Sequence, residues 1–553
     1  MRTPIASIKS CVAASLFLAT SFAQADPILT SWFTKYSTEY ARVIQTATNT
    51  TGTQNVTPVT TWPTSGIPNN NSTNNTSTNL PASQYLPAYS DVQKIRYDAN
   101  NVYINSSGFA SYTMGPFLNG KGGLFGFWPL SQNYTVSFPL KPGTVPVSKT
   151  THQGGLIGLM VNGVGIYDLG DAFGFVQTAN SPAVTGSDAM GSTGTTHPWW
   201  RDALSVEVVT FDPGFAHQPG LNGQYHYHAE PKALRYQLGD NMQATYNPTN
   251  NNYLYTEDTS NLHHSPILGW SFDGYPIYGP YGYSNPTNPA SPVTRMRSGL
   301  ILRNSANAAT YGVTDLTTNA VGRTTLPKWA AIAEGFTYVA GVNNDYNLTP
   351  SLYGPATSYT STGPNAATYS LGRYIGDYDY LGDRTNALTG TNYQPGIDFD
   401  LDQYNGRTCV TPDFTNGTYA YFVAIDAAGN PVFPYMLGKQ YYGTKSGSAQ
   451  GVTVPISGIT NFFIGGTNLQ EVLKAPSVNS GNGTITLTWS SIEGGTYVLR
   501  TSTNLANPTW TTVSTLSAAT NAILTTAIDA GAALTNTARF YRTIRTTVAP
   551  FTP

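Results

Sequence analysis

Apolar residues in this chain recur in short runs that alternate with polar or aromatic positions, which is the period expected of β-strands. Two such runs, over residues 156–167 and 267–278, each carry an Asn-Gly or Asp-Gly pair near the centre, the turn chemistry typical of a hairpin. Near the C-terminus, Thr484–Trp489, Tyr497–Arg500 and Arg539–Arg542 also read as short strands. The pattern predicts a mainly β protein, with a large β-rich domain followed by a small β-sandwich.

The two hairpin segments align with each other without gaps, and each is followed by a tyrosine-rich segment. Asn222–His228 reads Asn-Gly-Gln-Tyr-His-Tyr-His, and Asn416–Phe422 reads Asn-Gly-Thr-Tyr-Ala-Tyr-Phe. This order predicts a duplicated β unit, although chance recurrence of such turns and tyrosines in this composition is an alternative. If the halves are related, the histidines of the first copy serve a site rather than the strand, because the second copy has Ala420 and Phe422 there.

The order of segments along the chain predicts export and at least two domains. Residues 1–25 are typical of a secretory signal peptide, with a positive start, an apolar stretch and an Ala-Gln-Ala cleavage site. Residues 26–90 are expected to form an N-terminal strand and then a mobile loop rich in Thr, Asn and Ser. We expect the large domain over 91–445, a short linker, and the sandwich over 476–550. The protein is therefore expected to be secreted, periplasmic or on the cell surface.

Composition narrows the classes of partner. Charged residues make up 10% of the chain and the net charge is −2, so nothing favours nucleic acid as a partner. No stretch beyond the signal is apolar enough to predict a transmembrane segment. Once the signal is removed, Cys409 is the only cysteine, so the fold must hold without an intrachain disulfide.

The candidate chemistry lies in the histidines, all seven of which fall between residues 152 and 264. In a strand, His226 and His228 share one face, and two neighbouring imidazoles supply two ligands of a metal site. We expect His217 and His264 to complete the set, with Asp273 as a further ligand, an outer partner or a general base. Imidazole suits copper and zinc alike, so the sequence predicts a site for either metal.

A second candidate site is acidic. Asp398, Asp400 and Asp402 would fall on one face of a strand, where like charges repel unless a cation neutralises them. Calcium is one such cation. An arginine is the alternative, with Arg373, Arg384 and Arg407 as the nearest choices.

Three functions remain open at this point. The protein binds copper or zinc after export, or it is an enzyme that uses an open position on the metal for hydrolytic or oxidative chemistry. The alternative is a surface adhesion or carbohydrate-interacting protein, in which the histidines are structural and the C-terminal module contacts the cell surface or a polysaccharide. None of the common serine-hydrolase, zinc-protease, phosphate-binding or dithiol motifs is present, so no reaction is assigned.

Several segments together resemble the YHYH-domain proteins, an exported bacterial family named for the tetrapeptide at residues 225–228. They are Trp200–Ala203, Glu207–Gln218, Gly223–His228, His264–Pro280, Asn405–Pro412, Gly417–Phe422 and Phe433–Tyr435. The resemblance runs from about Asp91 to Gly443 and implies an exported protein whose domain has no assigned reaction. The C-terminal unit resembles the fibronectin-III-like modules appended to many exported bacterial proteins.

Overall fold

The protein is described by a computed structural model, which covers the following residues: 26–37, 41, 43, 89–120, 125, 129–219, 222–248, 252–339, 341, 344–362, 366–449, 451–465, 476–491, 496–505, 508–518, 524–530 and 538–547. The predicted signal peptide and the Thr/Asn/Ser-rich stretch lie outside these residues. The described N-terminal residues begin with a short helix, α1 (Pro27–Thr30), and residues 31–37 follow as coil and a turn. Most of the segment in which the N-terminal strand is expected lies outside the described residues.

The prediction of a mainly β protein is confirmed, and the largest sheet has seven strands in the order β20-β21-β13-β12-β4-β5-β9. Their bounds are β4 (Leu156–Met160), β5 (Gly165–Tyr167), β9 (His226–Tyr227), β12 (Ile267–Ser271), β13 (Pro276–Tyr278), β20 (Gly406–Cys409) and β21 (Thr418–Phe422). Both predicted hairpins are present, as β4-β5 and β12-β13, and they lie side by side at the centre. Both predicted tyrosine strands, β9 and β21, flank them.

The seven-stranded sheet has an approximate two-fold axis between β4 and β12. These strands are antiparallel, and Leu159 and Trp270, which occupy the same place in the two aligned segments, face each other. Both hairpins contain a β-bulge at the same position. Glycine is required there in each half, because a Cβ would lie 2.5 Å from a backbone oxygen at Gly158 and 2.8 Å at Gly269. The duplication predicted from the sequence is therefore confirmed in the strand pairing.

The tyrosine strands repeat with the same register. Each runs parallel to the second strand of its hairpin, with Ile166 opposite Tyr227 in the first half and Ile277 opposite Tyr421 in the second. These four residues hold equivalent positions in the aligned segments. Where the two halves differ at the tyrosine strand, they therefore differ in side chains, while the backbone pairing is equivalent.

The turn before each tyrosine strand repeats as well. In each turn the N–H of an aspartate, Asp212 or Asp402, donates to the carbonyl four residues later at 2.9 Å. The third residue after that aspartate has a positive φ in both, 71° at Phe215 and 65° at Asn405. The alignment of the halves thus includes these turns, which the sequence comparison did not detect because their side chains differ.

A four-stranded sheet with the order β22-β1-β2-β3 shares one hydrophobic core with the seven-stranded sheet. Its strands are β1 (Val92–Tyr97), β2 (Asn101–Ser106), β3 (Tyr134–Pro139) and β22 (Thr460–Ile464). Phe138 and Phe272 meet in that core at 5.4 Å between ring centroids. Ser448 forms a bridge with Ser137, and β22 pairs with β1, so the described residues 446–449 and 451–465 pack with the large domain, although a linker was expected after residue 445.

Smaller sheets and helices make up the rest of the described part of the large domain. A three-stranded sheet has the order β7-β6-β8, from β6 (Gly170–Ala179), β7 (Thr185–Met190) and β8 (Trp200–Asp202). Two-stranded ribbons are formed by β10 (Met242–Asn247) with β11 (Asn252–Glu257), β14 (Tyr281–Tyr283) with β15 (Val293–Arg295), β16 (Leu300–Leu302) with β19 (Tyr378–Tyr380), and β17 (Thr325–Pro327) with β18 (Asp345–Asn347). The α-helices after α1 are α2 (Leu204–Glu207), α3 (Lys232–Gln237), α4 (Ser305–Tyr311) and α5 (Lys328–Glu334), and 3₁₀ turns include η3 (Val208–Thr210).

Within the described residues, no helix has the length and hydrophobicity that a membrane crossing requires.

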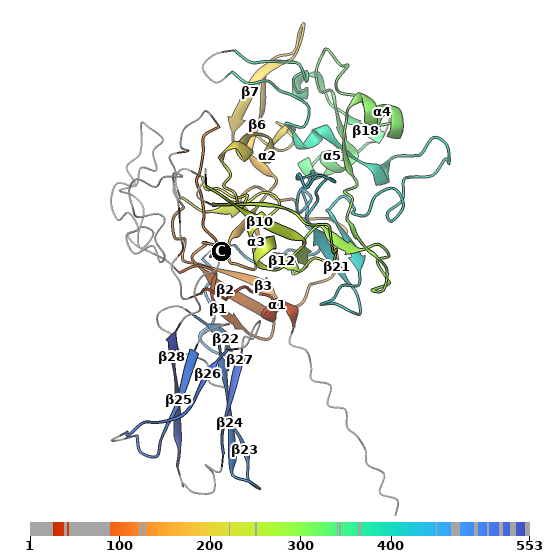
Figure 1. Ribbon diagram of the computed structural model, residues 1–553. Coiled ribbons are helices and arrows are strands. Elements are labelled where there is room, and N and C mark those ends of the chain that lie inside the picture. Colours follow the sequence, from red (N-terminus) through yellow and green to blue (C-terminus); the bar gives the residue numbers. More distant parts are fainter. Residues whose placement is uncertain are drawn as a thin grey trace, which may run out of the picture.

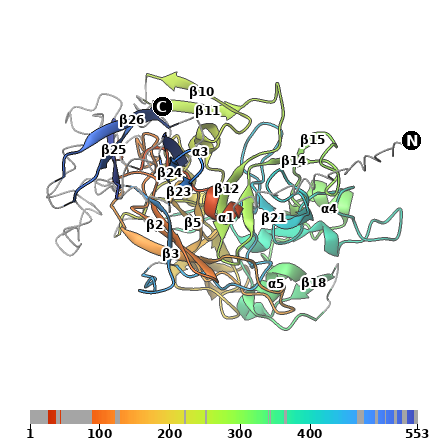
Figure 2. The same ribbon diagram turned by 90° about the horizontal axis from the view of Figure 1, so that it is seen from below.

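The C-terminal unit consists of two three-stranded antiparallel sheets. One has the order β23-β24-β27 and the other β26-β25-β28. The strands are β23 (Ser477–Asn479), β24 (Thr484–Ser490), β25 (Thr496–Ser502), β26 (Thr511–Ser517), β27 (Leu524–Asp529) and β28 (Phe540–Thr547). Trp489 of one sheet and Tyr497 of the other belong to a single core, so the sheets pack face to face. This unit projects from the end of the large domain that carries β1 and β22 (Figure 1). In the view from below, β25 and β26 lie at the side of the molecule away from α4 and β18 (Figure 2).

Candidate metal centre

Four side chains converge at the β9 edge of the seven-stranded sheet: Glu207, His217, His226 and His228. Each offers one ligand atom, and these atoms all lie within 4.8 Å of one another. The Nε2 atoms of His226 and His228 are 3.0 Å apart. One carboxylate oxygen of Glu207 lies 3.3 Å from His217 Nε2 and 3.1 Å from His228 Nε2. A group of this composition and spacing could hold a metal ion.

The alternation of side chains along β9 determines where two of these residues point. His226 and His228 meet on one face of β9, while the hydroxyls of Tyr225 and Tyr227 meet that of Tyr112 on the other face. The prediction that the two imidazoles share a face is confirmed. The tyrosine hydroxyls are buried and bonded to one another, so this second face serves packing.

The other two residues come from the segment before β9. The predicted return of the loop onto the strand is confirmed, because the N–H of His217 donates to the carbonyl of His226 at 3.2 Å and the reverse bond measures 2.8 Å. Glu207 is the last residue of α2, and that short helix directs its carboxylate at two of the imidazoles. The cluster therefore depends on one helix end, one turn and one strand.

The far nitrogens of the three rings have fixed partners. His226 Nδ1 lies 2.7 Å from the carbonyl of Gln224, and His228 Nδ1 lies 2.8 Å from the carbonyl of Asp168. Since a carbonyl can only accept, each Nδ1 carries a hydrogen and donates it. All three Nε2 atoms can then present a lone pair to the cluster, provided that His217 has the same tautomer.

The partner of His217 fixes that tautomer. Thr210 Oγ1 lies 2.6 Å from His217 Nδ1, and the hydroxyl already donates its own hydrogen to the carbonyl of Glu207 at 2.7 Å. The hydroxyl therefore accepts from the ring, and Nε2 of His217 is also a lone pair. Metal-binding histidines almost always have such a partner on the second nitrogen. Three lone pairs that face one another repel, unless a metal ion or a proton lies between them.

Burial and the carboxylate act in opposite directions on these rings. Burial, together with the neighbouring imidazoles, lowers the pKa of His217 and holds that of His226 well below its usual range. Burial also disfavours the charged form of His228, but the hydrogen bond and charge of Glu207 outweigh it and raise the pKa of His228. Burial raises the pKa of Glu207, but the contacts with His217 and His228 lower it by more. The pKa of Glu207 therefore lies well below its usual range. The cluster favours two neutral imidazoles beside one position where positive charge is stabilised.

A cavity of about 590 Å³ lies against the cluster and is lined by all four residues. The ring of Tyr167 stacks on His226 at 3.7 Å between centroids and forms part of the wall. Asp171 and Arg201 form an ion pair at 2.5 Å in the same cavity, and the guanidinium lies 4.2 Å above the ring of Phe173. The remaining lining is Phe125, Gln153, Gly154, Gly155, Gly170, Ala172, Met190, Val206, Thr210, Gln218 and Pro219. A small molecule could therefore reach a metal ion from this side.

The equivalent place in the second half lacks these ligands. Arg407 pairs with Ala420 across β20 and β21 as His217 pairs with His226 in the first half. Phe422 follows at the place of His228, and the guanidinium of Arg407 lies 5.4 Å from its ring centroid. Among the residues that the structure describes, no other group of three or more histidine, cysteine or acidic side chains has its ligand atoms this close together.

His264 lies in this second half and not with the cluster. Its ring packs 5.2 Å from Tyr278 and 6.2 Å from Phe422, and its Nδ1 is 2.8 Å from the carbonyl of Ser265. The physical reason is the two-fold relation of the hairpins. The residue that precedes the second hairpin faces the second tyrosine strand, and its counterpart before the first hairpin is Gln153, which lines the cavity of the cluster.

Asp273 also lies elsewhere. It accepts hydrogen bonds from the hydroxyl of Tyr421 at 2.7 Å and from the N–H of Gly443 at 2.8 Å. In the aligned hairpins Asp273 corresponds to Asn162, which donates to the hydroxyl of Tyr227 at 3.3 Å. Both residues thus support the tyrosine face of their strand, opposite the face that bears the histidines in the first half.

The acidic segment proposed for calcium is not a strand. Residues 398–402 form a turn with isolated bridges. Asp400 pairs with Arg297 at 2.9 Å, an arginine that the sequence did not single out, and Asp398 accepts a backbone N–H at 2.7 Å. Asp402 accepts from the hydroxyl of Tyr419 at 2.9 Å within the repeated turn. These carboxylates are satisfied by the chain itself and do not converge on one point.

Sequence reasoning missed Glu207. It stands ten residues before His217, and no periodicity connects a helix end with a distant turn. The available signal was its place at the start of the Glu207–Gln218 segment, one of those that carry the family resemblance.

Comparison with known proteins supplies the family and little else. No curated protein and no solved structure matches the chain. A family model described as YHYH protein matches residues 135–434, which include the seven-stranded sheet, both tyrosine strands and the four clustered residues. That match covers more than half of the chain, and so the chain belongs to the YHYH protein family.

Proposed function

We propose that this protein is an exported protein that binds one copper or zinc ion at Glu207, His217, His226 and His228. The observation that carries the proposal is the convergence of three Nε2 lone pairs, each fixed by a hydrogen bond at the opposite ring nitrogen. Three imidazoles and a carboxylate suit either metal, and calcium and magnesium prefer oxygen ligands alone.

The alternative occupant of the cluster is a proton. Without a metal, a proton on His228 would be stabilised by Glu207 at 3.1 Å and by the lone pair of His226 at 3.0 Å. That arrangement would serve stability only. It leaves His217 Nε2 without a hydrogen bond in a buried place, which a metal ion would remedy.

A second candidate function is catalysis at the same metal. It is favoured by the cavity of about 590 Å³ beside the ligands, which gives a small molecule access to an open coordination position. Metal at such a position activates water or oxygen. Contact with a cell surface or polysaccharide through the C-terminal sandwich remains the competing proposal for the protein as a whole.

Elemental analysis of the purified protein tests the proposal directly. The protein is isolated from its native compartment, or refolded with Cu(II) or Zn(II) and then dialysed, and its metal content is measured by mass spectrometry. We expect about one equivalent per chain, and none in the His226→Ala/His228→Ala double variant. An electron paramagnetic resonance spectrum distinguishes Cu(II), which gives a signal, from Zn(II), which is silent.

The matched control is His264→Ala, which removes a buried imidazole from the second half of the sheet. This variant should keep its full metal content. Less than about a tenth of an equivalent in the wild-type protein after loading with either metal would leave the proton as the occupant and refute the proposal.

A further inference from the structure

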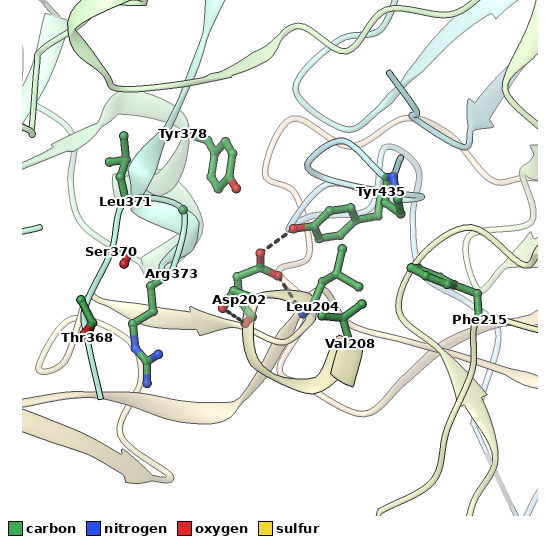
Figure 3. Close-up of a pocket in the computed structure, with 13 residues that line it drawn as sticks. Asp202, Leu204, Val208, Phe215, Thr368, Ser370, Leu371, Arg373, Tyr378 and Tyr435 are labelled. Atoms are coloured by element: carbon green, nitrogen blue, oxygen red, sulfur yellow. Dashed lines mark hydrogen bonds between the residues drawn. The ribbon is translucent and has the colours of Figure 1, made fainter. Parts of the chain in front are cut away.

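A second cavity, of about 420 Å³, lies on the other side of α2 and η3 from the histidine cluster. Leu204 and Val208 line this cavity, while Glu207 and Thr210 of the same segment line the first one. Asp202 lines this cavity, and in Figure 3 the rings of Tyr378 and Tyr435 lie above its carboxyl. Two of the segments that carry the family resemblance, and that the metal site does not use, meet here: Trp200–Ala203 and Phe433–Tyr435.

Among the described residues that line this cavity, Asp202 alone carries a carboxyl group. The residue is 1% exposed, and its carboxyl accepts from the hydroxyl of Tyr435 at 2.5 Å and from the N–H of Leu204 at 3.2 Å. Among the described residues, no lysine, arginine or histidine forms an ion pair with it. Arg373 also lines the cavity, but it pairs with Asp188 at 2.5 Å instead. An ionised carboxyl that is buried without a cation is costly, and a cationic ligand would remove that cost.

Aromatic and aliphatic side chains make up much of the lining, beside the polar residues Ser205, Thr368, Ser370 and Arg373. Tyr378 has one ring face covered by Phe433, stacked at 3.9 Å, and its edge and hydroxyl face the space above Asp202 (Figure 3). Phe215 closes the far side with Val208. Phe215 can take a cation, because Lys232 Nζ lies 5.0 Å from its ring centroid. Aromatic rings around an anionic group attract alkylammonium ions through their π faces and accept the alkyl groups.

We propose that this cavity is a binding site for a small organic cation, with a quaternary or alkylated ammonium group placed between Asp202 and the rings of Tyr378, Tyr435 and Phe215. The aliphatic wall of Leu204 and Val208 accommodates the alkyl groups. Thr368 and Ser370 at the opposite end offer hydroxyls to a polar tail (Figure 3).

The electrostatics of Asp202 support this assignment. Burial raises its pKa to about 8, against the hydrogen bonds from Tyr435 and Leu204 that lower it. The carboxyl is therefore largely neutral at pH 7 while the cavity has no cation. A cation at this place would make the ionised form the stable one.

Calorimetric titration of the purified protein with choline chloride tests the proposal, and 3,3-dimethyl-1-butanol, which has the same shape without the charge, is the comparison ligand. We expect choline to bind at least about tenfold more tightly than the neutral compound, equivalent to ~1.4 kcal/mol. Asp202→Asn should abolish that preference. His226→Ala should leave choline binding unchanged, which separates this site from the metal centre.

Asp402→Asn is the matched control, because Asp402 is a half-buried carboxyl that also accepts from a tyrosine hydroxyl, but in the repeated turn of the sheet. It should leave choline affinity within about twofold of wild type. Should Asp202→Asn fail to fold, Val208→Trp decides the question, because the larger ring fills the cavity and should prevent binding. Equal affinity for the two compounds, binding of neither at about 10 mM, or choline binding that survives Val208→Trp would each overturn the proposal.

Discussion

The two halves of the seven-stranded sheet have matching hairpins, bulges and turns, and their tyrosine strands pair in the same register, yet they differ in three side chains that matter for chemistry. The first half has His217, His226 and His228 where the second has an arginine, an alanine and a phenylalanine. On the opposite face of the strands the halves agree, with paired tyrosines and a hydrogen-bonded aspartate in each. The comparison shows that the backbone does not require the imidazoles. Their presence in one half is evidence for a site, and the tyrosines, present in both, belong to the scaffold.

The largest effect on metal affinity is expected when a histidine of the first half is replaced by the residue that the second half has at the same place. His226→Ala places alanine where the second half has Ala420, a position that the strand tolerates. Metal affinity should fall by more than ~100-fold, beyond the ~10–100-fold typical of changes to the outer partners of a metal ligand. Calorimetric metal titration measures the loss, and circular dichroism should show an unchanged β spectrum. A variant that unfolds would mean that the imidazole supports the strand, and the comparison of the halves would then be misleading.

The next effect concerns how the ligands are held. Thr210→Val removes the acceptor for His217 Nδ1 but keeps the volume of the side chain. The ring can then rotate or change tautomer, so metal affinity should fall by ~10–100-fold while the free energy of unfolding changes little. Unchanged affinity in the metal titration would show that His217 is not a ligand.

Much of the scaffold could be predicted because it is local. Alternation and Asn-Gly or Asp-Gly turns define the hairpins, and the period of two places His226 and His228 together without any knowledge of the tertiary fold. Glu207 could not be predicted, because its position depends on how α2 packs. The places of His264 and Asp273 could not be predicted for a different reason. The alignment of the two hairpins does not say which tyrosine strand each hairpin faces, because that depends on the order of the strands in the sheet.

The tyrosine face provides a test in both halves. Tyr225→Phe removes a hydroxyl that donates to Asp212 at 2.7 Å, and Tyr419→Phe removes one that donates to Asp402 at 2.9 Å. Each change leaves a buried carboxyl short of a donor, so each should lower the free energy of unfolding by ~1–3 kcal/mol in a urea titration. Metal affinity should be unchanged in both variants. A stability loss confined to one half would contradict the equivalence of the two turns.

The smallest difference between the halves is expected in their titration. Burial, which outweighs the hydrogen bonds in each turn, raises the pKa of Asp212 to about 7 and that of Asp402 to about 6, while an unfolded chain has aspartates near ~3.9. The neutral carboxyls therefore contribute stability that is complete below ~4 and is lost as pH rises through the folded pKa. Asp212→Asn should remove the decrease in the free energy of unfolding that continues up to about pH 7. Asp402→Asn should remove the decrease that ends near pH 6. Urea titrations at a series of pH values between the unfolded and folded pKa values measure how the free energy of unfolding depends on pH in each variant. The difference between variant and wild type should level off about one pH unit later for Asp212→Asn than for Asp402→Asn, which corresponds to ~1.4 kcal/mol. If neither variant changes the slope, the aspartates are ionised in the folded protein, and water or a cation must then reach these turns.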